Sequence, residues 1–516
     1  MMPYLLKNSF ISLILGLYSL FMLYHLFMSF RFPFLLLFAC FLYSETDFRD
    51  ISISEYKNIL SETENTKQFY RDYLTKARLS DKEINSIISF YAPNELYRSY
   101  IYSRSANWRG VPIFVKDNID TKNLANTAGS KALLDNLPKD DAQIIKNLKK
   151  AGFVIAGKTN LSEWANFRAS SSTSGWSSVG GQTYNPYNLK YNPCGSSSGS
   201  AAIVAEGIAP ASIGTETNGS IVCPASINGV VGIKPTVGLV SRDGIIPISS
   251  SQDTAGPMAR SVYDAAIVLE AISGRDPKDK TTFNIPRDYD FKALTKLDPN
   301  YLNGKRIGVI KISDDAPEAT KNLTNKIIIV LENLGAEVIE ISLKPLDSDD
   351  WSKEFYLLLY EFNLGLNDYL QKSSSKTRNV EELIEFNNQN KREILKYFGQ
   401  DILEESIKAI DDAAYRDALK LIEASKARID TVLEEESIIA IVGLTRNPAW
   451  KTNYKTGDNF ENGWGNGSIS AIAGYPHITI PLDYVDGLPT GVSFMGRAWD
   501  EVNLLNIAYA FEQENN

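Results

Sequence analysis

Short apolar runs alternate with helix-periodic stretches along the chain, a pattern that predicts an α/β fold. Residues 110–121, GVPIFVKDNIDT, begin as an apolar strand that leads directly into Lys116. Residues 141–160 combine an amphipathic helix, a glycine stop at Gly152 and a second buried strand at residues 153–156. A helix followed by a buried strand is a repeating unit of sheets that are covered by helices.

The segments around this pattern differ in character. Residues 45–104 are polar with apolar positions at helical spacing, which predicts surface helices. Residues 168–188 are rich in Ser and Gly without periodicity, which predicts a loop that forms the wall of a site. Residues 298–345 again indicate strands and helices, whereas residues 351–436 indicate a long, charged, helical insertion. Residues 437–513 predict further strands and a terminal helix.

The N-terminal region is strongly apolar. Residues 10–30 carry no formal charge and are long enough to span a bilayer of about 30 Å, so one interpretation is a membrane anchor. Another is a start at Met28, with Arg31 as the basic end of an export signal and LFAC as a lipobox that places a lipid on Cys40. A third is a buried N-terminal hairpin of the fold.

The first two interpretations predict an exported or membrane-associated protein, periplasmic or lipoprotein-like, rather than a cytoplasmic one. We therefore divide the chain into a hydrophobic signal or anchor region, residues 1–44, and a main domain, residues 45–516. The main domain exceeds the roughly 250–300 residues of a single hydrophobic core, which predicts two structural domains or one large sheet with insertions.

Composition narrows the chemistry. The formal net charge of −9 lacks the basic footprint of nucleic-acid binding, so no nucleic-acid partner is expected. The chain has only two histidines, His25 and His477, and no CxxC or HExxH motif, so no metal site is expected. The three cysteines, Cys40, Cys194 and Cys223, are an odd number at wide spacing, which favours apolar packing residues over a disulfide.

A serine at the end of a glycine turn is a candidate nucleophile. A nucleophilic serine needs a nearby base that accepts its proton. Ser220 follows Gly219 in GTETNGSIVC. A Ser-His-Asp site would have to use His477, which lies where a turn enters a strand and fits a structural role better. Lysine is the other common base. Lys116 ends a buried strand, and burial lowers the pKa of a lysine towards values at which the neutral amine exists.

A second turn with hydroxyl groups lies upstream, in CGSSSGSAA, where Ser196 could relay a proton between Ser220 and Lys116. The two turns are separated by a predicted helix with a serine N-cap and by a strand, which can bring both turns to the same edge of a sheet. The exposed N–H groups of the glycine turn can hold a developing oxyanion.

Five motifs occur in order along the chain: GVPIFVKDNID, GKTNLSEW, GSSSGSAA, GTETNGSI and GVVGIKPTVGLVSRDGIIP. With them the chain resembles the amidase signature family, strongly over residues 109–260 and more loosely at the C-terminal AGYPHITIPL. NPCGSSSGSA and NLSEWANFR look most like the bacterial peptide amidase branch. The resemblance implies an α/β fold with a large mixed twisted β-sheet flanked by helices on both faces.

The family carries a Ser–cis-Ser–Lys triad and requires no metal or organic cofactor. The resemblance places the nucleophile at Ser220, the bridging serine, which follows a cis peptide bond, at Ser196, and the lysine at Lys116. It also places the oxyanion amides and two further hydroxyl groups beside the triad. The oxyanion amides are those of Thr217, Asn218, Gly219 and Ser220, and the two hydroxyl groups are those of Ser197 and Thr215.

Two positions depart from the family pattern. Asn218 stands where many members have glycine, although its backbone N–H can still donate and Asn tolerates a positive φ better than most residues. Val222 stands near the nucleophile, where some members have an arginine that could pair with an acid at Glu216. That pairing is missing here, which leaves the role of Glu216 open.

The resemblance implies an amide hydrolase that releases ammonia or an amine from a carboxamide, with a peptide C-terminal amide as one substrate, through an acyl-enzyme. Its substrate would be a small molecule or a peptide amide, and specificity is expected in residues 168–188 and 351–436. One alternative is an ammonia-generating glutaminase like the A subunit of a tRNA-dependent amidotransferase. Another is an inactive family member that acts as a binding protein.

Overall fold

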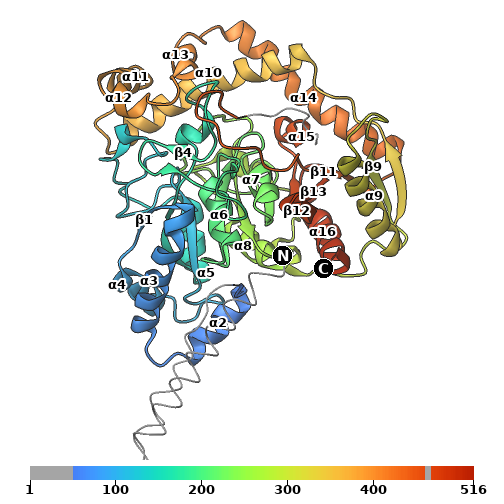
Figure 1. Ribbon diagram of the computed structural model, residues 1–516, viewed down its shortest axis with the longest axis horizontal. Helices are drawn as coiled ribbons and strands as arrows, with labels where there is room; N and C mark the ends of the chain where they lie inside the picture. The colour runs from blue at the N-terminus through green and yellow to red at the C-terminus, as the bar shows by residue number, and fades with distance from the viewer. Residues whose placement is uncertain (1–49, 459–466, 516) are drawn as a thin grey trace, which may run out of the picture. The chain divides into compact units, whose positions relative to one another are not determined.

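The structure is a computed structural model that describes residues 50–458 and 467–515 (Figure 1). The predicted signal or anchor region, with Cys40, lies outside these residues. Within the described ranges, no helix has both the length and the apolar character that crossing a membrane requires. Residues 48–516 form one compact unit by their internal contacts.

A mixed sheet of eleven strands runs through the described part of the chain, in the order β1-β3-β2-β6-β8-β7-β12-β13-β11-β9-β10. In that order the strands are β1 (Ile87–Phe90), β3 (Val154–Thr159), β2 (Pro112–Lys116), β6 (Ala211–Glu216), β8 (Thr254–Ala259), β7 (Val231–Lys234), β12 (His477–Val485), β13 (Leu488–Met495), β11 (Ile441–Leu444), β9 (Arg306–Ile310) and β10 (Glu337–Ile341).

Parallel and antiparallel pairs coexist in this sheet. β2 is parallel to both of its neighbours, β3 and β6, and β9 is parallel to β10 and β11. The strands between these two groups, from β6 to β11, pair antiparallel. All residues of β2, β3 and β6 are buried, as expected for strands that are covered on both faces. The predicted α/β fold with a large mixed sheet is thereby confirmed.

Helices flank the sheet (Figure 1). α5 and α16 both contact α8, α6 packs on β2, β3 and β6, and α7 packs on β7, β12 and β13. Their bounds are α2 (Ile53–Glu62), α3 (Thr66–Ile84), α4 (Pro93–Tyr102), α5 (Gln143–Ala151), α6 (Ser198–Ala205), α7 (Val222–Ile227), α8 (Val262–Ile272), α9 (Glu318–Asn333), α15 (Gly467–Ala473) and α16 (Glu501–Asn515). Short 3-10 helices are η1 (Lys131–Leu133), η2 (Glu163–Asn166), η3 (Lys280–Asn284) and η4 (Phe291–Thr295).

The helix and strand predicted over residues 141–160 show how local sequence produces local structure. Ile144, Ile145 and Leu148 lie on one face of α5 and are buried. Gly152 ends the helix with φ 106°, a left-handed conformation that glycine adopts without steric cost, and its N–H donates to Leu148 O. β3 then begins two residues later.

The predicted helical insertion is a set of five helices, drawn in yellow and orange in Figure 1. α10 packs against α14, which packs against α15. Phe362 and Leu366 of α10 share an apolar cluster with Phe167 and Ile248, so α10 covers loops, whereas Leu433 of α14 clusters with Ile441 of the sheet. The helices are α10 (Ser348–Lys372), α11 (Val380–Gln389), α12 (Lys391–Ile394), α13 (Asp401–Ser406) and α14 (Asp412–Glu435).

Three local features differ from the sequence prediction. The four-residue strand β1 lies in the segment expected to be helical, and it is too short to produce a recognisable alternation. α3 is not only a surface helix, because Tyr70, Tyr73 and Leu74 on its inner face are buried. The loop at residues 168–188 contains a small hairpin of β4 (Trp176–Ser177) and β5 (Gly181–Gln182).

Candidate active site

Lys116 is the last residue of β2, and its side chain is fully buried, with 0% of its surface exposed. Its ammonium group donates to Ser196 Oγ at 2.7 Å and to Thr215 Oγ1 at 2.8 Å, and it lies 3.2 Å from Thr215 O. Burial lowers the pKa of Lys116 to about 7, because removal of water disfavours the charged form. The negative charges of Asp253 and Glu216 oppose that shift.

Ser196 lies in the turn that precedes α6, and the Gly195–Ser196 peptide bond is cis. A Cβ at Gly195 would overlap with Ser162 Oγ, so the close approach of these loops favours glycine. Ser197 N donates to Ser220 O at 3.1 Å and so connects this turn to the turn that carries Ser220. The two predicted serine turns therefore lie side by side.

Ser220 lies in the turn between β6 and α7, with 8% of its surface exposed. The backbone N–H groups of residues 217–220 donate to no acceptor within the described part of the chain. The same holds for the Ser220 hydroxyl group, so no hydrogen bond joins it to Ser196 Oγ here. The positive φ of this turn, 83°, falls on Gly219 and not on Asn218.

Glu216, whose role the sequence left open, holds the start of α7. Its Oε2 accepts from Ile221 N at 2.7 Å and from Val222 N at 3.0 Å. These N–H groups have no partner inside the helix, so a carboxylate at this end satisfies them and is stabilised by the helix dipole. Glu216 thus anchors the chain immediately after Ser220.

Thr215 contacts Lys116 directly, and Ser197 contacts Thr215. The sequence predicts the N-cap of this helix at Ser200, but α6 begins earlier, with Ser197 at its N-cap position, and the Ser197 hydroxyl group does not cap the helix. It donates instead to Thr215 O and accepts from Thr215 N, at 3.0 and 3.1 Å. Thr215 Oγ1 also accepts from Asn118 Nδ2 at 3.0 Å. Sequence reasoning missed Asn118, although it stands two residues after Lys116.

Asp253 is a second buried residue that the sequence reasoning did not single out. Its Oδ1 accepts from Thr217 Oγ1 at 2.5 Å, and its Oδ2 accepts from the backbone N–H groups of Ile248 and Ser249. Burial raises the pKa of Asp253 to about 6, against the effect of these hydrogen bonds. The signal that could have found it is the motif SQDTAGP, within the region of family resemblance.

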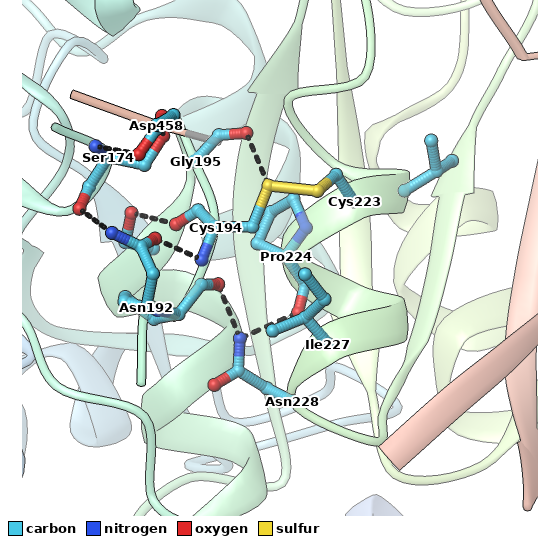
Figure 2. Close-up of a disulfide and its surroundings, with 12 residues drawn as sticks. Ser174, Asn192, Cys194, Gly195, Cys223, Pro224, Ile227, Asn228 and Asp458 are labelled. Atoms are coloured by element: carbon cyan, nitrogen blue, oxygen red, sulfur yellow. Dashed lines mark hydrogen bonds between the residues drawn. A yellow bond between two sulfur atoms is a disulfide. The ribbon is translucent and has the colours of Figure 1, made fainter. Parts of the chain in front are cut away.

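Cys194 and Cys223 form a disulfide, which contradicts the expectation that they are separate packing residues (Figure 2). Their Cα atoms are 6.1 Å apart. Cys194 precedes Ser196 by two residues and Cys223 lies in α7, so the disulfide links the two serine turns a second time. Neighbouring bonds hold its ends, including the donation from Cys194 N to Asn192 Oδ1 at 2.7 Å. Spacing in sequence could not reveal this pairing, because it depends on Cα proximity in the fold.

His477, the histidine that a Ser-His-Asp site would need, begins β12 and is buried. Its Nε2 lies 2.6 Å from Ser493 Oγ. Burial, and then the nearby charge of Lys234, lower the pKa of His477 to about 3. His477 does not line either of the two described cavities at Ser220. The expected structural role agrees with this position.

Two cavities meet at Ser220. The larger, about 540 Å³, extends along residues 242–254 to the insertion, where Tyr360, Leu364 and Tyr415 line it. The smaller, about 190 Å³, is lined by Phe167, Ser174, Arg446 and the disulfide, among others. Both segments expected to determine specificity, residues 168–188 and 351–436, therefore contribute to the walls.

The described residues contain no cluster of three or more His, Cys, Asp or Glu side chains suited to a metal ion.

Comparisons with known proteins agree with this geometry. The family model described as Amidase matches residues 68–505. A probable amidase of Arabidopsis thaliana is 40% identical over 414 residues, which are 78% of this chain and 76% of that protein. The A subunit of the glutamyl-tRNA(Gln) amidotransferase of Caldanaerobacter subterraneus is 33% identical over 486 residues, 90% of this chain and 96% of that protein.

Among solved structures, native peptide amidase from Stenotrophomonas maltophilia superposes with a TM-score of 0.83 and 41% identity, covering 92% of this chain and 98% of that one. The mixed sheet, the ordered motifs and the family match agree. The chain therefore belongs to the amidase signature family and is a hydrolase of amide C–N bonds.

Proposed function

We propose that this protein hydrolyses carboxamides, with peptide C-terminal amides as the substrate class, and that Ser220, Ser196 and Lys116 carry out the reaction. The observation that carries the proposal is the 2.7 Å hydrogen bond between Lys116 Nζ and Ser196 Oγ, inside a buried site next to the Ser220 turn. A lysine whose pKa is about 7 is partly neutral at neutral pH and can accept a proton.

In the first step, neutral Lys116 takes the proton of Ser196, and Ser196 takes that of Ser220. Ser220 Oγ forms a bond to the amide carbon, and the carbonyl oxygen becomes an oxyanion. The N–H groups of residues 217–220 stabilise this charge, because they are donors already in position before the reaction. The proton that Lys116 gained keeps the charge of the site balanced.

In the second step, the tetrahedral intermediate collapses and the C–N bond breaks. Lys116 returns its proton through Ser196 to the departing nitrogen, so ammonia or an amine leaves as a neutral molecule. Water then attacks the acyl-enzyme by the same route and releases the carboxylic acid. Thr215, held by Ser197 and Asn118, fixes the position of Lys116 throughout.

The larger cavity would receive the acyl part of the substrate, because departing ammonia requires little space. Its volume of about 540 Å³ lies in the range of small-molecule sites. Isoleucines at positions 245, 246 and 248 and the tyrosine pair Tyr360 and Tyr415 offer apolar and aromatic contacts. The 41% identity to a peptide amidase supports a peptidyl acyl group.

A second candidate is a glutaminase that supplies ammonia, as in a tRNA-dependent amidotransferase. The 33% identity to the A subunit of such an enzyme over 90% of this chain favours it. An inactive binding protein is disfavoured, because all three proposed catalytic side chains are present and Lys116 and Ser196 are in contact.

We also propose that the protein is exported or membrane-associated. Two independent features support this location: the uncharged apolar stretch at residues 10–30 and the Cys194–Cys223 disulfide. Disulfides persist in oxidising compartments and are rare in the reducing cytosol.

Ammonia release tests the function directly. The purified full chain would be given amidated peptides, simple aliphatic amides and free glutamine. We expect the highest kcat/KM with amidated peptides, loss of activity in Ser220→Ala, and labelling of Ser220 by a fluorophosphonate probe. Preference for glutamine would favour the second candidate, and an adduct on Ser196 with Ser220 unmodified would reverse the roles of the two serines.

A further inference from the structure

The helical insertion reaches the Ser220 turn through one buried carboxylate. Glu354 lies on α10, and only 4% of its surface is exposed. Its Oε1 accepts from Asn218 Nδ2 at 2.7 Å and from Gln252 Nε2 at 3.1 Å. Asn218 belongs to the turn whose N–H groups donate to no acceptor in the described part of the chain. α10 is thus attached to the proposed oxyanion site by a side-chain hydrogen bond.

The side chain of Asn218 is held from two directions. Its amide nitrogen donates to Glu354, and its Oδ1 accepts from Ser468 Oγ, at the start of α15, at 2.9 Å. Gln252, which shares Glu354 Oε1, also donates to Thr217 O at 3.4 Å. The turn therefore depends on side-chain anchors from α10, α15 and the loop before β8 for its position.

Burial raises the pKa of Glu354, and its hydrogen bonds with Asn218 and Gln252 oppose that shift. The carbonyl oxygen of a carboxyl group can accept a hydrogen bond in either protonation state. Without Glu354, the amide groups of half-buried Asn218 and buried Gln252 would both lose an acceptor, which destabilises the present position of the turn. The helix itself would stay in place, because Leu359, Phe362 and Leu366 of α10 are buried in an apolar cluster.

We propose that Glu354 and Asn218 are positioning residues, which hold the N–H groups of residues 217–220 in the geometry that stabilises the oxyanion. The insertion then completes the catalytic turn as well as forming a cavity wall. This inference rests on the proposed function, because it assigns those N–H groups to the oxyanion. It also explains what Asn218 contributes at a position where many family members have glycine: an amide that two other elements can hold.

The test compares Glu354→Ala, Glu354→Gln, Asn218→Ala and the double variant Glu354→Ala/Asn218→Ala with the full-length parent. Glu354→Gln keeps an acceptor oxygen, and Asp350→Asn is the matched control because it removes an ion pair from the same helix without touching the turn. We expect Glu354→Ala to lower kcat about 10- to 100-fold with little change in KM, since loss of transition-state geometry acts on kcat. Glu354→Gln and Asp350→Asn should stay within about threefold of the parent.

Two further readouts separate positioning from general loss of structure. The affinity of a peptide aldehyde, which forms an oxyanion-bearing adduct with Ser220, should fall in parallel with kcat. The loss in the double variant should be smaller than the sum of the two single losses, because both changes break one shared hydrogen bond. Additive losses, or an aldehyde affinity that stays at the parent level, would overturn the proposal.

The remaining outcomes are also decisive. If Glu354→Ala does not fold, the test uses Asn218→Ala, because the side chain of Asn218 is only half-buried and its removal should leave the fold intact. A lower kcat at an unchanged Tm in Asn218→Ala supports the proposal. A normal kcat in that variant refutes it. Full activity in Glu354→Ala together with an inactive Ser220→Ala would refute the positioning role alone. Full activity in Ser220→Ala would instead refute the proposed function.

Discussion

At the residue scale, the proposed chemistry depends on the environment of one lysine. Lys116 is fully shielded from solvent and has three hydrogen-bonding contacts with Ser196 and Thr215. As an ammonium it donates to all of them, whereas as a neutral amine it has a lone pair that can accept from the Ser196 hydroxyl group. The same geometry therefore serves both protonation states, which a proton relay requires.

Replacing this lysine should remove activity without removing the fold. We expect Lys116→Ala to lower kcat/KM by about 10²–10⁴-fold or more, because the chain then lacks its general base. His477→Ala is the matched control, since it also removes a buried basic side chain of a central strand. Ammonia release and thermal unfolding of both variants would be measured together. Near-normal turnover in Lys116→Ala, or complete inactivation in a folded His477→Ala, would refute the assignment.

The pH dependence follows from the pKa of Lys116. The neutral amine is the active form, so kcat/KM should fall below about pH 7 as Lys116 becomes protonated. Asp253, with a pKa of about 6, also titrates in this range and acts on Lys116 through its charge. Its negative charge favours the ammonium, so Asp253→Asn should move the acidic limb to lower pH. A profile that is flat down to pH 5 in the parent would exclude Lys116 as the base.

At the element scale, the site is built from the ends of short elements that are fastened to one another. β2 presents Lys116, β6 presents Thr215 and the turn before α7 presents Ser220. The Cys194–Cys223 disulfide and the hydrogen bond from Ser197 N to Ser220 O join the two serine turns. Because these two links are independent, each turn stays close to the other even when one link is broken.

The disulfide should contribute to stability more than to catalysis. Closing a loop of this length in the unfolded chain typically adds about 2–4 kcal/mol to the free energy of unfolding. We therefore expect Cys194→Ala/Cys223→Ala to lower the Tm while keeping much of the activity of the parent. Chemical unfolding of the parent and of the double variant, each with and without reductant, measures the contribution of the disulfide to stability. Reductant should lower the stability of the parent and leave that of the double variant unchanged. Equal unfolding curves for the oxidised and reduced parent would contradict the prediction.

At the scale of the whole molecule, one mixed sheet supports the site and a helical insertion closes it. The residues of the site come from distant parts of the described chain, from Lys116 in β2 to Ser468 in α15. Residues 48–516 form one compact unit by their internal contacts.

Deleting residues 1–44 should therefore leave a soluble and active enzyme. We expect the truncated chain, residues 45–516, to keep the kcat and KM of the parent and to lose attachment to membranes. Fractionation of cells that express each form, with activity assays of both, measures the two effects. An inactive or insoluble truncated chain, next to a soluble cytosolic parent, would show that the N-terminal region belongs to the catalytic body.

The sequence by itself determined the local parts of this protein. The strand that ends at Lys116, the stop at Gly152, the turn at Gly219 and the absence of a usable histidine were all predicted, because each depends on residues within a few positions of one another. The order of five motifs was enough to identify the family and, with it, the mixed sheet and the proposed catalytic residues.

Only the tertiary structure decided which distant side chains meet. The Cys194–Cys223 pair, the contact of Glu354 with Asn218 across 136 positions and the partners of Glu216 were not predicted. A hydrogen bond or a disulfide requires two groups within a few ångströms, and that distance is set by how the whole sheet and the insertion pack. Local patterns carry no information about such distances, so these contacts emerge only when the chain is folded.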